Sequence, residues 1–200
     1  MGKKKIFSLI VIAFLLLSVT KKFSEITIQK MSNPPGTLKV AENLYLDKTD
    51  ICNVHYREFL YWMKNVYGIN STEYKAVLPD TTKWSSLKDT YASLDKSYLR
   101  QPSYNFFPVI GVSNKQALQY SKWRSDRVME MTLIEHRIIK AKSSPIPKDS
   151  VFTIEKYFNG QYYNIKPSPN LLFYPDYRLL DSTINTSNGF RNVCTYKKWE

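Results

Sequence analysis

Residues 44–68 read LYLDKTDICNVHYREFLYWMKNVYG, and this stretch holds the clearest folding signal in the chain. Its second half spaces large apolar side chains three and four residues apart, which places them on one face of a helix. These side chains are Tyr56, Phe59, Leu60, Met63 and Tyr67. Asn53 is a residue type that caps helix N-termini, and Gly68 is one that ends helices. The stretch therefore predicts a helix over residues 54–67, preceded by a short strand at residues 44–47.

A second helix is predicted over residues 114–128. Ser113 and Gln116 form an S-x-x-Q capping box at its start. The turn chemistry and apolar runs elsewhere predict short strands. These are residues 37–40, residues 107–112, a strand pair within residues 151–165 around an Asn159-Gly160 turn, and a turn followed by a strand over residues 188–194. Helices and strands together predict an α/β domain.

The composition is that of one globular domain. The chain has 200 residues, of which 43% are hydrophobic and 23% charged, and these values exclude wholesale disorder. The formal net charge is +12, and it falls to +7 without the five lysines that flank the first apolar run. The sequence has no basic helix, zinc-ligand spacing or RNA-binding aromatic signature. The charge therefore predicts a basic surface and no nucleic-acid partner.

The N-terminus has the pattern of an export signal. Residues 1–5 carry three lysines, and residues 6–19 (IFSLIVIAFLLLSV) form an unbroken apolar run. This run is short for a transmembrane span, which needs about 20 residues. The pattern predicts a signal peptide or an uncleaved anchor over residues 1–22. We therefore expect an exported protein of the periplasm or cell envelope that meets the membrane only through this segment.

Cys52 and Cys194 are the only cysteines and lie far apart in the chain. In an exported protein they form a disulfide if the fold brings them together. They are too few and too separated for a zinc site made of cysteines, and His55 and His136 are the only histidines. The spacing supports no Cys–His catalytic pair, so both histidines are predicted to be structural.

Several blocks of sequence resemble one known family when taken in order. These blocks are PGT at residues 35–37, LYLDKTDICN at 44–53, YLRQPSY at 98–104, FPVIGVS at 107–113, WRSDR at 123–127 and GFR at 189–191. Together they resemble the formylglycine-generating enzyme, or sulfatase-modifying factor, family. The stretch LPDTTKW at residues 78–84 is similar to the branch found in gliding-motility and secretion-linked envelope lipoproteins.

The resemblance implies one domain over residues 33–200. The implied fold is α/β (α+β) and C-type-lectin-like, with two main helices, short strands and much irregular structure. The matching positions imply a family framework of five residues: Trp123, Arg124, Gly189, Phe190 and Arg191.

The chain also departs from that family. Catalytic members carry an R-G-G-S-W block and two nearby cysteines that bind copper(I), and neither is present here. The G-N-x-W-E-W segment that helps to build a calcium site is also missing, so the chain resembles a shortened member. The resemblance therefore implies no catalytic residues and no metal ligands. Copper belongs only to an oxidase alternative, and calcium only to the loop carboxylates of Asp47 and Asp50.

Three functions are open at this stage. The preferred one is a non-catalytic protein that binds an envelope protein partner, as in surface-protein assembly. The first alternative is an oxidase that converts a sulfatase cysteine to formylglycine. The second is a lectin-like module that binds a glycan or an anionic polymer, which the positive charge and the many tyrosines favour.

Three conspicuous side chains have simple structural interpretations. Trp123 lies at helical spacing and is predicted to be part of the core. Arg191 is predicted to be buried and to donate hydrogen bonds to backbone carbonyls. Asp126 is predicted to form a local ion pair with Arg124 or Arg127, of small value to stability.

Overall fold

The computed structural model describes residues 31–87, 97–142, 146–181 and 189–200. Within these residues the chain forms a mixed α/β fold with four α-helices and one four-stranded antiparallel sheet. The strands are β1 (Thr37–Ala41), β2 (Leu44–Asp47), β3 (Phe173–Leu179) and β4 (Asn192–Lys198). The helices are α2 (Asn53–Tyr67), α3 (Thr72–Ala76), α4 (Asn114–Glu135) and α5 (Ile154–Phe158). Short 3-10 helices cover Thr81–Leu87, Pro102–Tyr104 and Lys148–Ser150.

The sheet joins the two ends of the domain. Its strand order is β1-β2-β4-β3, so β2 pairs with β4 although most of the chain lies between them. Tyr45 on β2, Cys194 on β4 and Tyr177 on β3 lie side by side and face the core. The predicted strands at residues 37–40 and 44–47 are confirmed as β1 and β2.

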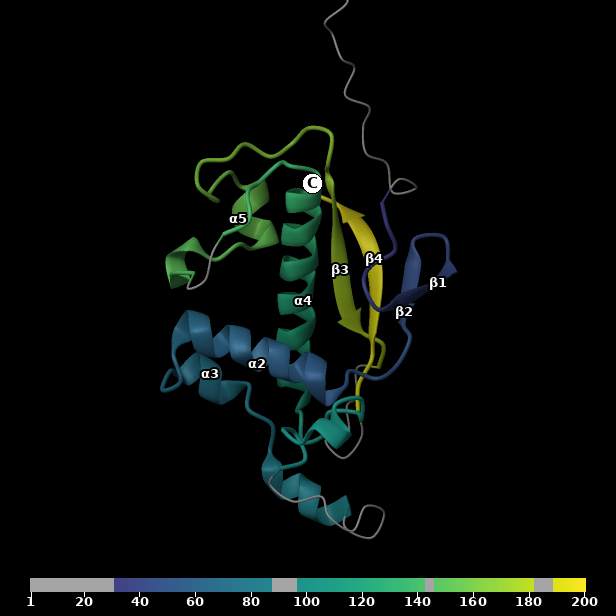
Figure 1. Cartoon of the computed structure of the whole chain (residues 1–200). Coiled ribbons are helices and arrows are strands. Elements are labelled where there is room, and N and C mark those ends of the chain that lie inside the picture. Colours follow the sequence, from purple (N-terminus) through teal and green to yellow (C-terminus); the bar gives the residue numbers. More distant parts are fainter. Residues whose placement is uncertain (1–30, 88–96, 143–145, 182–188) are drawn as a thin grey trace, which may run out of the picture.

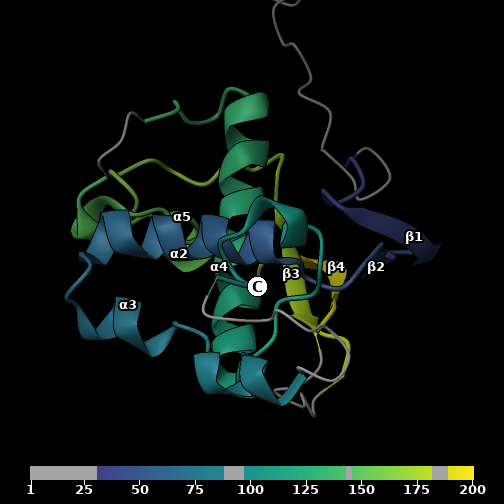
Figure 2. The same ribbon diagram turned by 60° about the horizontal axis from the view of Figure 1, so that its bottom comes forward.

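Helix α4 stands between the sheet and α5 (Figure 1). It packs mainly on β3, while α2 crosses it near its first turns, as the turned view shows (Figure 2). Two clusters of buried side chains result. One lies between α2 and the first half of α4 and includes Tyr56, Phe59 and Phe190. The other lies between the second half of α4, α5 and the sheet, and includes Met129 and Leu133.

Both predicted helices are confirmed, with two differences at their ends. Cys52 rather than Asn53 is the N-cap of α2, because the Asn53 side chain is buried and donates hydrogen bonds to the carbonyls of Tyr98 and Tyr104. Helix α4 continues beyond residue 128 to Glu135, because Met129 and Leu133 pack in the second cluster. The capping box of Ser113 and Gln116 forms with both of its hydrogen bonds.

Two strand predictions are wrong. In the segment of residues 107–112, Val109, Ile110 and Val112 are buried, which accounts for its apolar character. The segment forms no strand and has only an isolated bridge between Pro108 and Cys52. Residues 151–165 contain α5 instead of a strand pair. The Thr153 side chain caps that helix, and the segment Asn159-Gly160 ends it rather than turning a hairpin.

The C-terminal prediction is confirmed in part. A strand does follow the G-F-R segment, but it runs from Asn192 to Lys198, beyond the expected end at residue 194. Residue 188 of the expected turn lies outside the described residues, as does the predicted leader over residues 1–22. Among the residues that the structure describes, no helix is long and apolar enough to cross a membrane.

A buried ion pair ties the sheet to α4. Arg124 Nη1 on α4 lies 2.8 Å from Asp47 Oδ1 at the end of β2, and both side chains are largely shielded from solvent. The backbone N–H of Asn192, at the start of β4, donates to Asp47 Oδ2 at 2.8 Å. Burial raises the pKa of Asp47, and the Arg124 guanidinium opposes this rise.

Arg124 and Asn192 extend this pair to the rest of the fold. Arg124 Nη2 donates to the carbonyl of Pro35 at 2.8 Å, and its guanidinium lies 4.2 Å from the ring centroid of Tyr177. The Asn192 amide donates to Ser121 Oγ at 2.6 Å, one turn before Arg124 on α4. The Asp47–Arg124 pair therefore lies at the meeting point of three strands, α4 and the segment that enters β1.

We expect Arg124→Met to lower the free energy of unfolding by about 3 kcal/mol, because it leaves the Asp47 carboxylate buried without its counter-charge. Urea unfolding followed by circular dichroism measures this loss. Lys148→Met is the matched control, because Lys148 forms an exposed ion pair with Glu73 and its removal should leave the midpoint nearly unchanged. Equal midpoints for Arg124→Met and the wild type would contradict the role given to the buried pair.

Candidate binding groove

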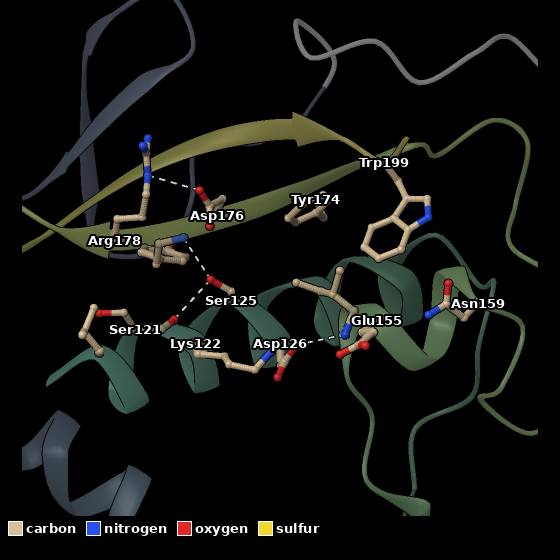
Figure 3. Close-up of a pocket in the computed structure, with 13 residues that line it drawn as sticks. Ser121, Lys122, Ser125, Asp126, Glu155, Asn159, Tyr174, Asp176, Arg178 and Trp199 are labelled. Carbon is tan, nitrogen blue, oxygen red and sulfur yellow. Dashed lines mark hydrogen bonds and ion pairs between the residues drawn. The ribbon is translucent and has the colours of Figure 1, made fainter. Parts of the chain in front are cut away.

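A groove of about 490 Å³ lies where α4, α5 and β3 meet (Figure 3). Helix α4 contributes Leu118, Ser121, Lys122, Ser125 and Asp126. Helix α5 and the turn after it contribute Ile154, Glu155 and Asn159. The sheet side contributes Tyr174, Asp176, Tyr177 and Arg178 from β3, and Trp199 from the end of β4. These residues come from parts of the chain that are far apart, so the groove exists only in the folded domain.

The edge of β3 that faces the groove is closed to further strand pairing. The backbone N–H of Tyr177 donates to Ser125 Oγ on α4 at 2.9 Å, and Ser125 Oγ in turn donates to the carbonyl of Ser121 (Figure 3). Pro175 lies two residues before Tyr177, so its backbone nitrogen faces the same edge of β3. Proline has no N–H group to donate there. An added strand would therefore find few backbone donors along this edge.

The two carboxylates of the groove nearest the sheet and α5, Asp176 and Asp126, already have partners. Asp176 Oδ2 lies 3.1 Å from Arg178 Nε and 2.8 Å from Lys197 Nζ. Asp126 is buried, and its Oδ1 accepts the backbone N–H of Ile154 at 2.9 Å. Burial raises the pKa of Asp126, and this hydrogen bond opposes the rise.

The groove ends at a fixed aromatic side chain. The Trp199 ring stacks on Phe158 with a centroid distance of 4.9 Å and an angle of 7° between the planes. Tyr174 meets the same ring edge-on at 6.0 Å. The backbone N–H of Trp199 donates to the carbonyl of Leu172 at 2.9 Å. A second pocket, of about 450 Å³, shares Tyr174 and Trp199 with the groove and is also lined by Lys197, Lys198 and Glu200.

The sequence did not indicate this groove. Strand β3 was not predicted, and a strand with Pro175 in its middle gives a weak pattern. The available signal was the alternation of residues 173–179, where Tyr174, Asp176 and Arg178 share one side of the strand. Nothing in the chain order connects that side with Lys122 or Trp199, because the folded sheet and α4 bring them together.

The condition set for a disulfide between Cys52 and Cys194 is not met in this structure, where both residues are free and buried. Cys194 lies in the middle of β4, within the second cluster of buried side chains. Cys52 precedes α2, and its Sγ lies 3.2 Å from Nδ1 of the exposed His55. The structure therefore brings together a thiol and an imidazole that sequence spacing did not connect. Their separation of three residues at a helix start was the available signal.

The residues that the family resemblance singled out take separate structural roles. Trp123 packs against the first cluster, as predicted for a core residue. Arg124 binds Asp47, as described above. Phe190 is buried against Tyr56, and a side chain on Gly189 would place its Cβ 2.7 Å from the Cβ of Pro108. This close approach explains why a glycine suits position 189.

The structural roles predicted for Arg191 and Asp126 need correction. The Arg191 side chain is 40% exposed, and its Nε donates to Asp50 Oδ1 at 2.6 Å instead of to backbone carbonyls. Asp126 forms no ion pair with its neighbours on α4, because it turns towards the backbone of α5. Arg127 pairs with Glu130 instead.

The carboxylates considered for calcium are engaged by arginines. Asp47 binds Arg124, and Asp50 binds Arg191. Within the described part of the chain, no group of three or more His, Cys, Asp or Glu side chains could hold a metal ion. The contacts of Asp47 and Asp50 therefore do not suit a calcium site.

Comparison of the chain with protein family models, with curated proteins and with solved structures found no match. The resemblance to the formylglycine-generating enzyme family, and the lectin-like fold that it implies, therefore stay predictions.

Burial raises the pKa of the Cys194 thiol to about 12, from an ordinary value of 9.0. We expect iodoacetamide at pH 9 to leave Cys194 unmodified in the folded Cys52→Ser variant and to modify it after unfolding in urea. Mass spectrometry of the alkylated protein measures both states. Between pH 9 and 12 the Cys194 thiol ionises in the unfolded protein but stays neutral in the folded protein. The free energy of unfolding therefore falls as the pH rises through that range. Rapid labelling of the folded variant at pH 9 would show that the thiol is accessible and ionised.

Proposed function

We propose that the protein is a non-catalytic binding component of the cell envelope and that the groove between α4, α5 and β3 is its binding site. The groove carries this proposal, because it combines a fixed aromatic end with charged and amide side chains that converge from three elements. The hydroxyls of Ser121 and Ser125 in its lining each donate to a backbone carbonyl of α4 and accept a further hydrogen bond, so they serve the fold. The predicted export signal supports the location in the envelope.

The resemblance to the formylglycine-generating enzyme family is part of this proposal. The chain would be a shortened member that keeps the framework positions around Arg124 and Phe190 and lacks the copper(I) site. Its two free cysteines support the loss of that chemistry, because linear copper(I) coordination needs two adjacent thiolates. Cys52 instead has His55 beside its sulfur, and Cys194 is fully buried in the sheet.

We expect Lys122→Glu to reduce capture of the envelope partner at least tenfold, because it replaces an exposed ammonium donor in the groove with a carboxylate. Immobilised protein is incubated with a detergent extract of the host envelope, and the retained material is quantified against the wild type. Lys115→Glu is the matched control, because Lys115 is exposed on the same helix and does not line the groove. Equal retention by both variants and the wild type would place the binding site elsewhere.

The oxidase alternative has a direct test. Purified protein is incubated with copper(I), oxygen and a peptide that contains the sulfatase cysteine motif, and mass spectrometry follows aldehyde formation. We expect no aldehyde, because neither cysteine has a second thiolate as a partner for copper. Turnover that disappears with Cys52→Ala or Cys194→Ala would restore the oxidase.

A further inference from the structure

We infer that the ligand of the groove is a short neutral oligosaccharide, seated against Trp199. This inference rests on the proposed function, since it names the chemistry that the same groove would recognise. Four properties of the groove support it: its aromatic end, its charge balance, its hydrogen-bonding groups and its closed strand edge.

The aromatic end offers a rigid apolar surface beside polar groups. Trp199 is only half-buried, although Phe158 and Tyr174 hold its ring from two directions. Figure 3 shows its indole on the side of the groove where Glu155 and Asn159 lie. Because the ring is already fixed, a ligand would not have to order it on binding. A sugar ring has an apolar face of C–H groups, which suits such a surface.

The charges around the groove favour a neutral ligand. The groove and the neighbouring pocket together contain four basic residues and four acidic residues, so their formal charges balance. The two bases nearest to Asp176, Arg178 and Lys197, are already paired with it. An anionic polymer would meet the carboxylates of Glu155 and Asp126 without an excess of positive charge. This argues against the anionic partner that the overall charge of the chain suggested.

The hydrogen-bonding groups suit hydroxyls. A hydroxyl both donates and accepts hydrogen bonds. It can therefore donate to the carboxylate of Glu155, donate to or accept from the amide of Asn159, and accept from the ammonium of Lys122. These three side chains are exposed and line the groove, and an ion-paired carboxylate such as Asp176 keeps further lone pairs for an additional donor. Recognition would then come from several polar groups around one aromatic ring.

The strand edge argues against an extended peptide. Peptides that bind along a sheet edge gain affinity from main-chain hydrogen bonds. Here the N–H of Tyr177 is taken by Ser125, and Pro175 has none. A peptide strand would find two of the edge donors missing, whereas an oligosaccharide needs no regular row of backbone donors.

The test uses the full chain and defined probes. A glycan array compares neutral oligomers of glucose, mannose and N-acetylglucosamine with uronic-acid and sulfated oligomers, and calorimetry then measures the strongest binder. We expect binding to a neutral oligomer, weakened at least tenfold by Trp199→Ala and also by Asn159→Ala, which changes only an exposed side chain. Tyr61→Ala is the matched control, because Tyr61 is an exposed aromatic residue on α2 outside the groove and its loss should leave binding unchanged.

The outcomes separate this inference from the proposed function. Partner capture that depends on Lys122, together with no binding to any oligosaccharide, would overturn the saccharide and keep the groove as a binding site. Binding only to anionic oligomers, or to a peptide released from the captured partner by proteolysis, would also overturn it. Capture that does not depend on Lys122, together with saccharide binding that Trp199→Ala leaves unchanged, would overturn both.

Discussion

The ion pair between Asp47 and Arg124 is the constraint on which the rest of the structure depends. It brings the end of β2 to the middle of α4, and the backbone of Asn192 completes the coordination of the same carboxylate. An unpaired charge at this depth is costly, so β2, β4 and α4 must all be in place for the pair to be satisfied. The position of α4 against β3, and with it the groove, follows from this requirement. The groove is therefore a product of the whole fold rather than of one local motif.

The sequence predicted the parts of the fold that one local pattern determines. Helix α2 was predictable because Tyr56, Phe59 and Met63 lie on one face of the helix and all three are buried. The prediction for α4 ends too early because this helix is buried on several sides. Met129 and Leu133 are buried in its second half, but they do not continue the single apolar face expected of a surface helix. Helix α5 was mistaken for a hairpin because Asn159-Gly160 suits both a turn and a helix end.

The candidate site was less accessible to such reasoning. Its residues share no spacing in the chain, and Lys122, Asp176 and Trp199 become neighbours only through the packing of α4 on β3 and the pairing of β3 with β4. The positions that the family resemblance singled out lie elsewhere. Arg124 and Phe190 hold the framework, whereas the side chains offered to a ligand are Lys122 on α4, Glu155 and Asn159 on and after α5, and Trp199 after β4. Ser121, Ser125 and Tyr177 belong to both sets, because they line the groove and also connect α4 with the sheet.

The contact of Ser125 with β3 also has a consequence for self-association. Exposed strand edges are templates for the aggregation of one copy on another. Ser125 and Pro175 remove two donors from the middle of β3, so a further strand would pair poorly beyond it. At the opposite edge, β1 has only five residues, carries Lys39 and has an irregular register against β2 between Lys39 and Ala41. A short, charged and bulged edge is a poor template. The domain can therefore expose Leu38 and Val40, each 55% exposed, without offering neighbouring copies a continuous strand to extend.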